Sequence, residues 1–467
     1  MITKFIKRIL RRDPMVKHTH ANNSGAPKRI AKKSHKIDPH LLSKNAVKVT
    51  QTLQQAGYEA FIIGGAVRDL VLGISPKDFD VATNATPDQV QRLFRKARLI
   101  GRRFQIVHVT FFGKGHPEII EVSTFRALLD NAGDHVAESG RILRDNVWGS
   151  QGEDAARRDF TINAMYYDPS TETVLDYHGG MVDMQKKVLR MIGDPAKRYR
   201  EDPVRMLRAI RFAAKTGFTL DAATRAPIAK LGKLLQDVPS ARLFDEILKL
   251  LMSGYSWAAI QGLRDAGLHY GLLPLLDHIL EDSKASKGSN DFVRLALANT
   301  DQRIQSGKSV SAGFLFATLL WPDLLKNWKA NLTKGMANIP ALQDAMDGTI
   351  ATQSSGMAIQ RRFESDMREI WSMQPRFEKR VGRYPYRLIE SPRFRAGYDF
   401  MLLRCATGEQ NPAIGEWWTN FITADPTAQE ELMVKAKSES GSTTSSPNKR
   451  RRRRKPKSAT LPENLAG

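Results

Sequence analysis

Residues 60–81 read AFIIGGAVRDLVLGISPKDFDV, and this stretch determines the fold class predicted for the first part of the chain. The apolar run Ala60–Ile63 is typical of a short buried strand. Two glycines interrupt it, and a helix through Arg68–Leu72 is expected to follow. Pro76 then precedes a second predicted strand, which carries Asp78–Val81. Strand, glycine turn, helix and strand in this order indicate a mixed domain of helices and strands.

The alternation of helices and strands continues on both sides of this stretch. Helices are predicted over Leu42–Ala56 and Ala85–Ala97, and strands over Ile106–Phe112 and Ile119–Thr124. The start of the second helix is predicted at Thr86-Pro87, because threonine often caps a helix and proline suits the first helical position. Residues 129–154 are charged, contain glycine and show no periodicity, so we expect a mobile loop there.

Beyond Asp202-Pro203 the strand signals largely disappear and helical spacing replaces them. Helices are predicted over Val204–Lys215, Ala222–Leu235, Ala241–Ser253 and Trp257–Gly267. Helical stretches then alternate with glycine and proline breaks as far as about Lys437. The predicted fold class is therefore α+β, with a head of helices and strands followed by an all-helical remainder.

Composition limits the class of protein. The chain of 467 residues is long enough for roughly two to four domains, and its mean hydropathy of −0.39 favours a soluble protein. The longest apolar run, Ala312–Trp321, is about half a membrane span and ends at Pro322, so no transmembrane helix is predicted. Cys405 is the single cysteine, which excludes a disulfide framework and a cysteine-rich zinc site and fits a reducing cytoplasm.

The net charge of +23 lies mostly at the two ends of the chain. Residues 1–40 carry a net +9, and residues 435–467 carry a net +8. Such basic segments favour nucleic acid as the partner over an anionic membrane or a tail that only adds solubility. Ile2–Leu10 places apolar side chains on one helical face among basic ones, which suits either a surface helix or weak contact with a membrane surface.

Asp78 and Asp80 are the first candidates for catalysis. On a strand, residues two apart share a face, so the two carboxylates would point the same way and repel each other. A divalent cation would keep both ionised, and Mg²⁺ prefers oxygen ligands completed by substrate phosphates. The alternative is an exposed turn with two solvated aspartates.

Gly64 and Gly65 precede this pair, between a strand and a helix. Glycines allow close approach of the backbone, and the free N–H groups of a helix N-terminus suit a phosphate, with Arg68 one turn inside. A glycine turn without any ligand is the alternative. No Walker A loop occurs in the chain.

A third carboxylate has two candidates. Glu121 is a lone charge in the apolar strand 119–122, and Asp159 lies in the segment RRDFTIN at 157–163. We favour Asp159, whose alternative role is a helix cap or a salt bridge to an arginine.

Four segments now resemble a known family. They are GGAVRD at 64–69, DFDV at 78–81, RRDFTINA at 157–164 and EDPVRMLR at 201–208. Together, and in this order, they resemble the class II nucleotidyltransferases of the DNA polymerase β superfamily, which comprise bacterial poly(A) polymerases and CCA-adding tRNA enzymes. The resemblance is dense over about residues 45–255. It implies a polymerase-β-like head with a small mixed sheet, helical neck and body domains, and template-independent addition of nucleotides to an RNA 3′ end.

The resemblance and the composition together predict five segments. These are a basic flexible arm (1–43), a nucleotidyltransferase head (44–190), a helical neck with base recognition (191–255), a helical RNA-binding body (256–437) and a disordered arginine-rich tail (438–467).

The resemblance also implies roles for individual residues. Asp78 and Asp80 would hold two Mg²⁺ ions, and Asp159 would be the third catalytic carboxylate. The implied nucleotide-binding residues are Gly64, Gly65 and Arg68 around the triphosphate, Arg126, Arg158 and Asn163 at phosphate or sugar, and Asp202 and Arg205 at the adenine base. For Asp202, the alternative is to cap the helix that begins at Pro203.

Three further segments favour polyadenylation over CCA addition. Residues 99–109, 367–378 and 391–400 resemble the polyadenylating members of the family. In the last segment, cations and rings alternate as in proteins that track single-stranded RNA, although packing of the aromatic side chains in a helical core explains part of the pattern. The predicted RNA contacts are Arg393, Arg395 and Tyr398 in the body and Arg451, Arg452 and Arg453 in the tail.

The predicted function is a polynucleotide adenylyltransferase that adds AMP from ATP to the 3′ ends of many RNAs, leading to their processing or decay. A CCA- or A-adding tRNA nucleotidyltransferase is the alternative. A non-catalytic RNA-binding protein is disfavoured, because a binder gains nothing from repelling carboxylates. A cytoplasmic monomer is expected.

Overall fold

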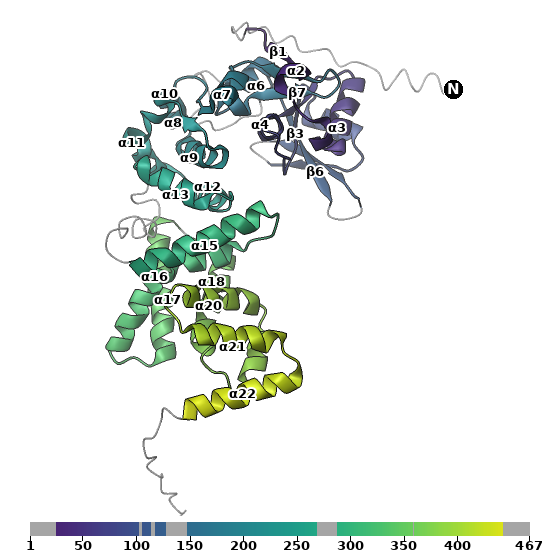
Figure 1. Ribbon diagram of the computed structural model, residues 1–467. Helices are drawn as coiled ribbons and strands as arrows, with labels where there is room; N and C mark the ends of the chain where they lie inside the picture. Colours follow the sequence, from purple (N-terminus) through teal and green to yellow (C-terminus); the bar gives the residue numbers. More distant parts are fainter. Residues whose placement is uncertain are drawn as a thin grey trace, which may run out of the picture. The chain divides into compact units, whose positions relative to one another are not determined.

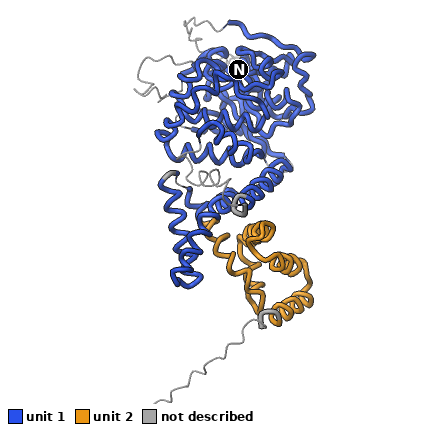
Figure 2. Tube along the Cα trace, turned by 60° about the vertical axis from the view of Figure 1, so that its left-hand side comes forward, with its two compact units in different colours: residues 1–364 blue, residues 365–467 orange. Residues whose placement is uncertain are grey.

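The computed structural model describes residues 25–101, 105–113, 117–127, 147–268, 287–357 and 359–441. The chain forms two compact units, residues 1–364 and residues 365–467 (Figure 2). The first unit contains the sheet with its helices and a series of further helices, and the second unit is helical.

An eight-stranded mixed sheet organises the start of the first unit (Figure 1). Its strand order is β1-β8-β7-β2-β3-β6-β5-β4. The strands are β1 (Lys28–Ala31), β2 (Ala60–Ile63), β3 (Asp80–Thr83), β4 (Ala97–Ile100), β5 (Ile106–Phe111), β6 (Glu118–Thr124), β7 (Met165–Asp168) and β8 (Thr173–Asp176). β3 and β6 run parallel, and the other neighbours run antiparallel. The mixed sheet confirms the predicted fold class, and its central strands are β2, β3 and β6.

Short helices pack on this sheet. They are α3 (Lys44–Gln55), α4 (Gly65–Val71), α5 (Pro87–Leu93) and α6 (Gln151–Arg157). The 3₁₀ turn η2 (Thr161–Asn163) precedes β7, and α7 (Gly180–Lys186) contacts η2. The strand Ala60–Ile63 is as predicted, because both of its faces are covered and Ile62 is fully buried. Thr86 caps α5 as predicted, and Gln89 completes a capping box.

Two predictions in this region are wrong in their extent. The helix predicted over Ala85–Ala97 ends at Leu93, because Ala97–Ile100 pairs with β5 as the edge strand β4. The loop predicted over residues 129–154 contains the start of α6, which Ser150 and Glu153 open with a second capping box. Residues 128–146 of that loop lie outside the described residues.

The prediction of a flexible arm over residues 1–43 is wrong for its second half. β1 pairs antiparallel with β8, and α2 (Lys32–His35) and η1 (Pro39–Leu41) follow it. Ile30 and Ile37 are buried, and the His35 ring stands edge-on to Tyr167 at 5.7 Å. Three buried side chains among basic ones are too few to give a recognisable period in the sequence. The predicted amphipathic helix Ile2–Leu10 lies outside the described residues.

The helices predicted after Asp202 are present, with one correction. The structure has α8 (Pro195–Glu201), α9 (Val204–Thr216), α10 (Ala222–Arg225), α11 (Ile228–Leu231), η3 (Gly232–Asp237), α12 (Ser240–Leu251) and α13 (Ser256–Asp265), and a small parallel pair of strands, β9 (Val188–Leu189) and β10 (Thr219–Leu220). The single helix predicted over Ala222–Leu235 is broken at Pro227, because proline has no N–H to continue the ladder.

Longer helices complete the first unit. They are α15 (Lys287–Gln305), α16 (Ala312–Thr333), α17 (Asn338–Gly356) and the start of α18 (Arg361–Met373). α16 includes the apolar run noted in the sequence and continues through Pro322. Of the helices that the structure describes, none combines the length and hydropathy needed to cross a membrane.

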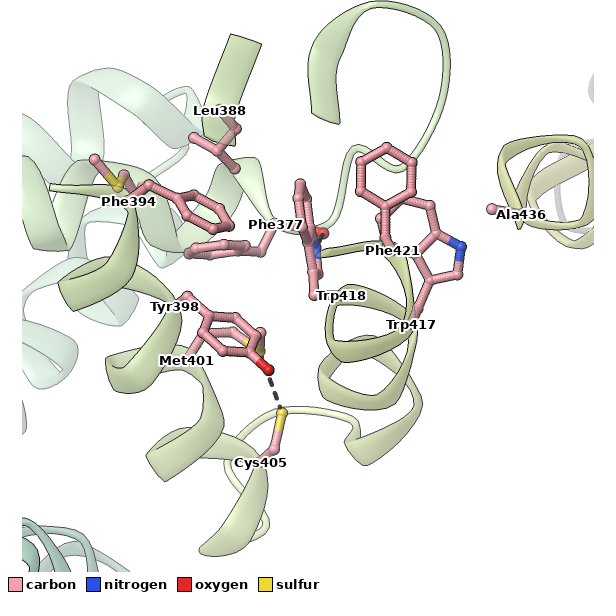
Figure 3. Close-up of a cluster of buried hydrophobic side chains, with 11 residues drawn as sticks. Phe377, Leu388, Phe394, Tyr398, Met401, Cys405, Trp417, Trp418, Phe421 and Ala436 are labelled. Atoms are coloured by element: carbon pink, nitrogen blue, oxygen red, sulfur yellow. Dashed lines mark hydrogen bonds between the residues drawn. The ribbon is translucent and has the colours of Figure 1, made fainter. Parts of the chain in front are cut away.

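The second unit contains the end of α18, η5 (Gln374–Arg376), α19 (Tyr384–Ile389), α20 (Phe394–Ala406), α21 (Pro412–Thr423) and α22 (Pro426–Gly441). Its core is aromatic (Figure 3). The Trp418 ring stands edge-on to Phe377, with ring centroids 5.2 Å apart, and its Nε1 donates to the Phe377 carbonyl at 2.9 Å. Because the buried indole N–H has a partner, the large ring is buried without an unpaired polar group.

Candidate active site

A cavity of about 260 Å³ lies where the central strands meet the end of α6. Its lining residues are Ile63, Asp80, Ile106, Glu121, Ser123, Arg126, Asp154, Arg157 and Arg158. Three carboxylates and three arginines therefore surround one small space. This charge composition suits a ligand that carries both phosphates and a cation.

Strand register brings the acids of the cavity together. Asp80 begins β3, and Glu121 is its partner across the parallel pair of β3 and β6. Burial raises the pKa of Asp80 to about 6, and the charges of Glu121 and Asp78 add to the effect while Arg158 opposes it. Asp80 is thus a crowded carboxylate that a cation would stabilise.

Asp78 does not share the strand with Asp80. β3 begins at Asp80, so the predicted strand starts two residues later than expected and Asp78 precedes it. The buried Phe79 anchors the backbone between them and leaves Asp78 exposed. The two charges still interact, as the raised pKa of Asp80 indicates.

Asp159 lies apart from this cavity, in an ion pair with the neck. Its Oδ2 accepts from Arg208 Nε at 2.8 Å and Nη2 at 2.6 Å, and its Oδ1 accepts from the Phe160 N–H and from Asn163. Burial disfavours its ionised form, but Arg208 and the other donors outweigh burial and lower the pKa to about 2. The alternative of a salt bridge describes Asp159 better than a role beside Asp80, and Glu121 is the third acid that lies there.

The glycine turn before α4 has the expected form, but Arg68 is already hydrogen-bonded to other side chains of the protein. Gly64 has a positive φ of 68° and precedes α4. Arg68 is buried, and it donates to Asp69 through Nε and Nη2 and to Asn163 Oδ1 through Nη1 at 2.8 Å. Arg68 and Asn163 therefore hold each other and do not line the cavity. Arg126 and Arg158 do line it, as predicted for phosphate contacts.

The predicted base-recognition pair is not formed through its side chains. Asp202 accepts from the Val204 N–H at 3.3 Å and from Arg242 Nη2 at 2.6 Å. Arg205 instead donates to Glu201 at 3.0 Å. The Asp202 side chain thus bonds to the first N–H of α9, as the cap alternative expects, although Pro203 occupies the N-cap position. Selection of the nucleotide base by Asp202 and Arg205 stays a prediction.

The predicted RNA contacts of the second unit are engaged within the protein. Arg393 pairs with Asp366 at 2.6 Å, and Arg395 pairs with Asp399 at 3.0 Å. Tyr398 is buried, and its hydroxyl bonds to Thr419 at 2.7 Å. Burial contradicts the prediction that the Tyr398 ring stacks on RNA bases. The tail arginines Arg451, Arg452 and Arg453 lie outside the described residues.

Sequence reasoning missed three residues in and around this site, and one of them is Arg157, which lines the cavity. Asp154 was placed in a loop, although its spacing of four from Arg158 on a capped helix indicates an ion pair. His108 lies opposite Glu121 on β5, with its Nε2 3.4 Å from the carboxylate. Only the strand register, which the sequence does not show, reveals this second contact.

No group of three or more His, Cys, Asp and Glu side chains is arranged to hold a metal ion by itself within the part of the chain that the structure describes. A cation at Asp80 would therefore need oxygen ligands from a bound substrate, which is the usual arrangement for Mg²⁺ at phosphates.

Three family models match the chain. Residues 60–190 match the poly A polymerase head domain, and residues 217–280 match the probable RNA and SrmB-binding site of polymerase A. Residues 334–457 match the polymerase A arginine-rich C-terminus. The head-domain match contains every residue that lines the cavity.

Curated relatives and a solved structure agree with these matches. The chain is 44% identical over 413 residues to poly(A) polymerase I of Salmonella typhi, which covers 86% of this chain and 88% of the relative. It is 36% identical over 284 residues to the CCA-adding enzyme of Bacillus subtilis, covering 61% of this chain and 67% of that protein. The crystal structure of the Bacillus stearothermophilus CCA-adding enzyme in complex with CTP aligns with a TM-score of 0.55 and 25% identity, over 87% of this chain and 94% of that one.

Proposed function

The chain belongs to the poly(A) polymerase family, and from this membership we propose that it adds AMP from ATP to RNA 3′ ends without a template. The observation that carries the proposal is the cavity in which Asp80 and Glu121 stand beside Arg126 and Arg158. Acids for a cation and arginines for phosphates are what nucleotidyl transfer from a triphosphate requires.

The residues fit a divalent cation. Asp80 is crowded by Glu121 and by Asp78, so a positive charge between them would relieve repulsion. Asp78 and Asp80 would hold Mg²⁺ together with phosphate oxygens of the nucleotide, and Glu121 would lie beside Asp80. When bound, Mg²⁺ would neutralise charge on the attacking hydroxyl and on the leaving pyrophosphate. We assign the third carboxylate to Glu121, since Asp159 is already paired with Arg208.

The arginines would bind and orient the triphosphate. Arg158 and Arg126 line the cavity, and Gly64 leaves the backbone open next to Arg158. In the reaction, the RNA 3′ hydroxyl would release its proton to solvent, and its oxygen would bond to the α-phosphorus of ATP as the bond from that phosphorus to pyrophosphate breaks. Arginine suits this position because its planar donors bind phosphate oxygens in pairs.

RNA would bind to the helical part of the chain and to its basic ends. The matches to an RNA-binding segment and to an arginine-rich C-terminus support this assignment. Contacts of Arg393, Arg395 and the tail arginines with phosphates would be independent of sequence, as expected for an enzyme that acts on many transcripts. For Arg393 and Arg395, RNA would have to compete with Asp366 and Asp399.

Base selection would rest on Asp202 and Arg205 in the neck. Side chains must select the base because no template is present, and an acid with an arginine can match the donor and acceptor of adenine. Arg205 would then leave Glu201, and Asp202 would leave Arg242. Cytoplasmic location and a monomeric state remain predictions from the sequence.

Extension of an unstructured RNA tests the proposed function. The wild-type chain, Mg²⁺ and ATP alone should give long ladders, whereas CTP alone should give none. One or two added residues on tRNA ends with CTP would indicate the CCA-adding activity of the other family branch. The double variant Asp78→Ala, Asp80→Ala should bind RNA but extend it no further, and normal extension by this variant would refute the assignment.

A further inference from the structure

The Arg158 guanidinium is hydrogen-bonded to the protein along the edge formed by Nε and Nη2, and its Nη1 side is open. Its Nη2 donates to Asp154 Oδ2 at 2.9 Å, and its Nε donates to the Tyr166 hydroxyl at 3.3 Å. Among the residues that the structure describes, Nη1 has no hydrogen-bond partner. A Cβ added to Gly64 would lie 3.4 Å from Nη1. The open edge of the guanidinium therefore faces the glycine turn that begins α4.

Asp154 joins three parts of the cavity wall. Its Oδ2 accepts from Arg158 and also from the Tyr166 hydroxyl at 2.6 Å, and its Oδ1 accepts from the Arg126 N–H at 3.3 Å. The residue is only 6% exposed. Burial opposes its ionisation, yet Arg158 and Tyr166 hold the pKa of Asp154 below its ordinary value. The carboxylate is therefore charged at neutral pH and fixed in place.

Tyr166 is the rigid end of this arrangement. Its ring is fully buried in β7, edge-on to Phe61, Phe125 and Tyr177 at centroid distances of 6.1, 6.3 and 6.2 Å. The Arg158 guanidinium also lies against this ring, 5.4 Å from its centroid. An aromatic cluster thus sets where the hydroxyl stands, and the hydroxyl and Asp154 together set the plane of the guanidinium.

We propose that Asp154 and Tyr166 are positioning residues that turn the open edge of Arg158 toward the phosphates of bound ATP. The inference rests on the proposed function, because it takes ATP to be the ligand of the cavity. Asp80 and Glu121 line the same cavity, so a guanidinium released from Asp154 would have two competing acceptors close by. Asp154 keeps Arg158 from pairing with the acids and leaves its donors for phosphate oxygens.

Ligand binding by the full chain tests this role. The variants are Asp154→Asn, Tyr166→Phe, Arg158→Ala and the double variant Asp154→Asn, Arg158→Ala. Asp154→Asn should weaken ATP binding by about tenfold, and Tyr166→Phe by about threefold, because each removes part of the hold on the guanidinium. Binding of adenosine, which has no phosphate, should change by less than about twofold. In the Arg158→Ala background, Asp154→Asn should weaken ATP binding no further.

Several results would overturn the inference. Equal losses for ATP and adenosine would show that Asp154 only stabilises the fold, and so would additive losses in the double variant. Unchanged ATP affinity in both single variants would also refute it. If thermal unfolding shows Asp154→Asn to be misfolded, Tyr166→Phe carries the test, because it keeps the ring and removes one donor.

The same experiment separates this inference from the proposed function. A wild-type chain that extends RNA with ATP, together with positioning variants that bind ATP normally, would refute the inference alone. A wild-type chain that binds ATP but extends no RNA would refute the proposed function and leave the positioning role intact. Absence of ATP binding by the wild-type chain would refute both.

Discussion

Asp80 and Asp159 are two carboxylates of the same sheet-containing region, and their surroundings are opposite. Asp80 faces Glu121 across the parallel strand pair, and its pKa is raised to about 6 by burial and by neighbouring negative charges. Asp159 is more deeply buried, yet Arg208 and other donors outweigh burial and lower its pKa to about 2. At Asp80, burial and neighbouring negative charges outweigh the charge of Arg158, whereas Asp159 has a hydrogen-bonded arginine partner within the protein.

This difference distinguishes a carboxylate suited to catalysis from one that stabilises the fold. A carboxylate whose oxygens are already bonded to protein donors must give up those bonds before it can bind a cation. A carboxylate crowded by its own kind gains from a cation at once. Both residues lie in segments that resemble the same family, so the motifs alone do not distinguish them. The contacts do, and they favour Asp80 and Glu121 for catalysis and Asp159 for joining the sheet to α9.

The largest expected effect tests the crowded acid. Asp80→Asn should lower the rate of AMP addition by about a thousandfold, which corresponds to about 4 kcal/mol in the barrier. Its free energy of unfolding, measured in urea without divalent cations, should stay equal or rise, because one of the repelling charges is gone. Single-turnover extension of an RNA primer measures the first quantity. A rate within tenfold of the wild type would remove Asp80 from the chemistry.

The paired acid should behave in the opposite way. Asp159→Asn removes the charge that Arg208 binds, and breaking a buried ion pair on one side costs about 3 kcal/mol. Urea unfolding measures this loss, and the rate of AMP addition per folded molecule should stay within about tenfold of the wild type.

Glu121→Gln is the matched control for Asp159→Asn, since it also neutralises one carboxylate of the same region. Glu121→Gln should lower the rate of AMP addition and leave the free energy of unfolding unchanged, because Glu121 lines the cavity beside Asp80. If Asp159→Asn instead lost rate while keeping its stability, the third catalytic carboxylate would be Asp159, and the comparison of the two acids would fail.

The sequence predicts this region well where local signals suffice. The strand Ala60–Ile63, the glycine turn and the threonine cap of α5 follow from short patterns of residue type. The partners of Glu121 and Asp159 do not, because they depend on strand register and on the packing of a helix 49 residues away from Asp159. The burial of Tyr398 likewise depends on side chains of α21 and of residues 373–388, so the local alternation of cations and rings leaves core packing and RNA contact both open.

Low pH should reduce the contribution of Asp159 to the free energy of unfolding, which tests the role assigned to its ion pair. Its folded pKa of about 2 is below the ordinary value of 3.8, so its ionised form stabilises the fold above about pH 4. This stabilisation of about 2 kcal/mol should disappear as the pH falls from about 4 to about 2. The measurement is the difference in urea unfolding between the wild type and Asp159→Asn at a series of pH values. A difference that grows on acidification would contradict the assigned direction.

Asp202 is intermediate between the two acids, and it should show the smallest effect. It pairs with Arg242, whose side chain is 48% exposed, so the pair should contribute less than about 1 kcal/mol to stability. Such a weak bond can be exchanged for a bond to a base, whereas the buried bond of Asp159 cannot.

Arg242→Ala should therefore free Asp202 and lower the KM for ATP by about twofold, with the free energy of unfolding almost unchanged. Asp202→Asn is the control, and it should reduce the preference for ATP over CTP. If both variants keep the wild-type preference and KM, Asp202 caps its helix and has no part in selecting the base.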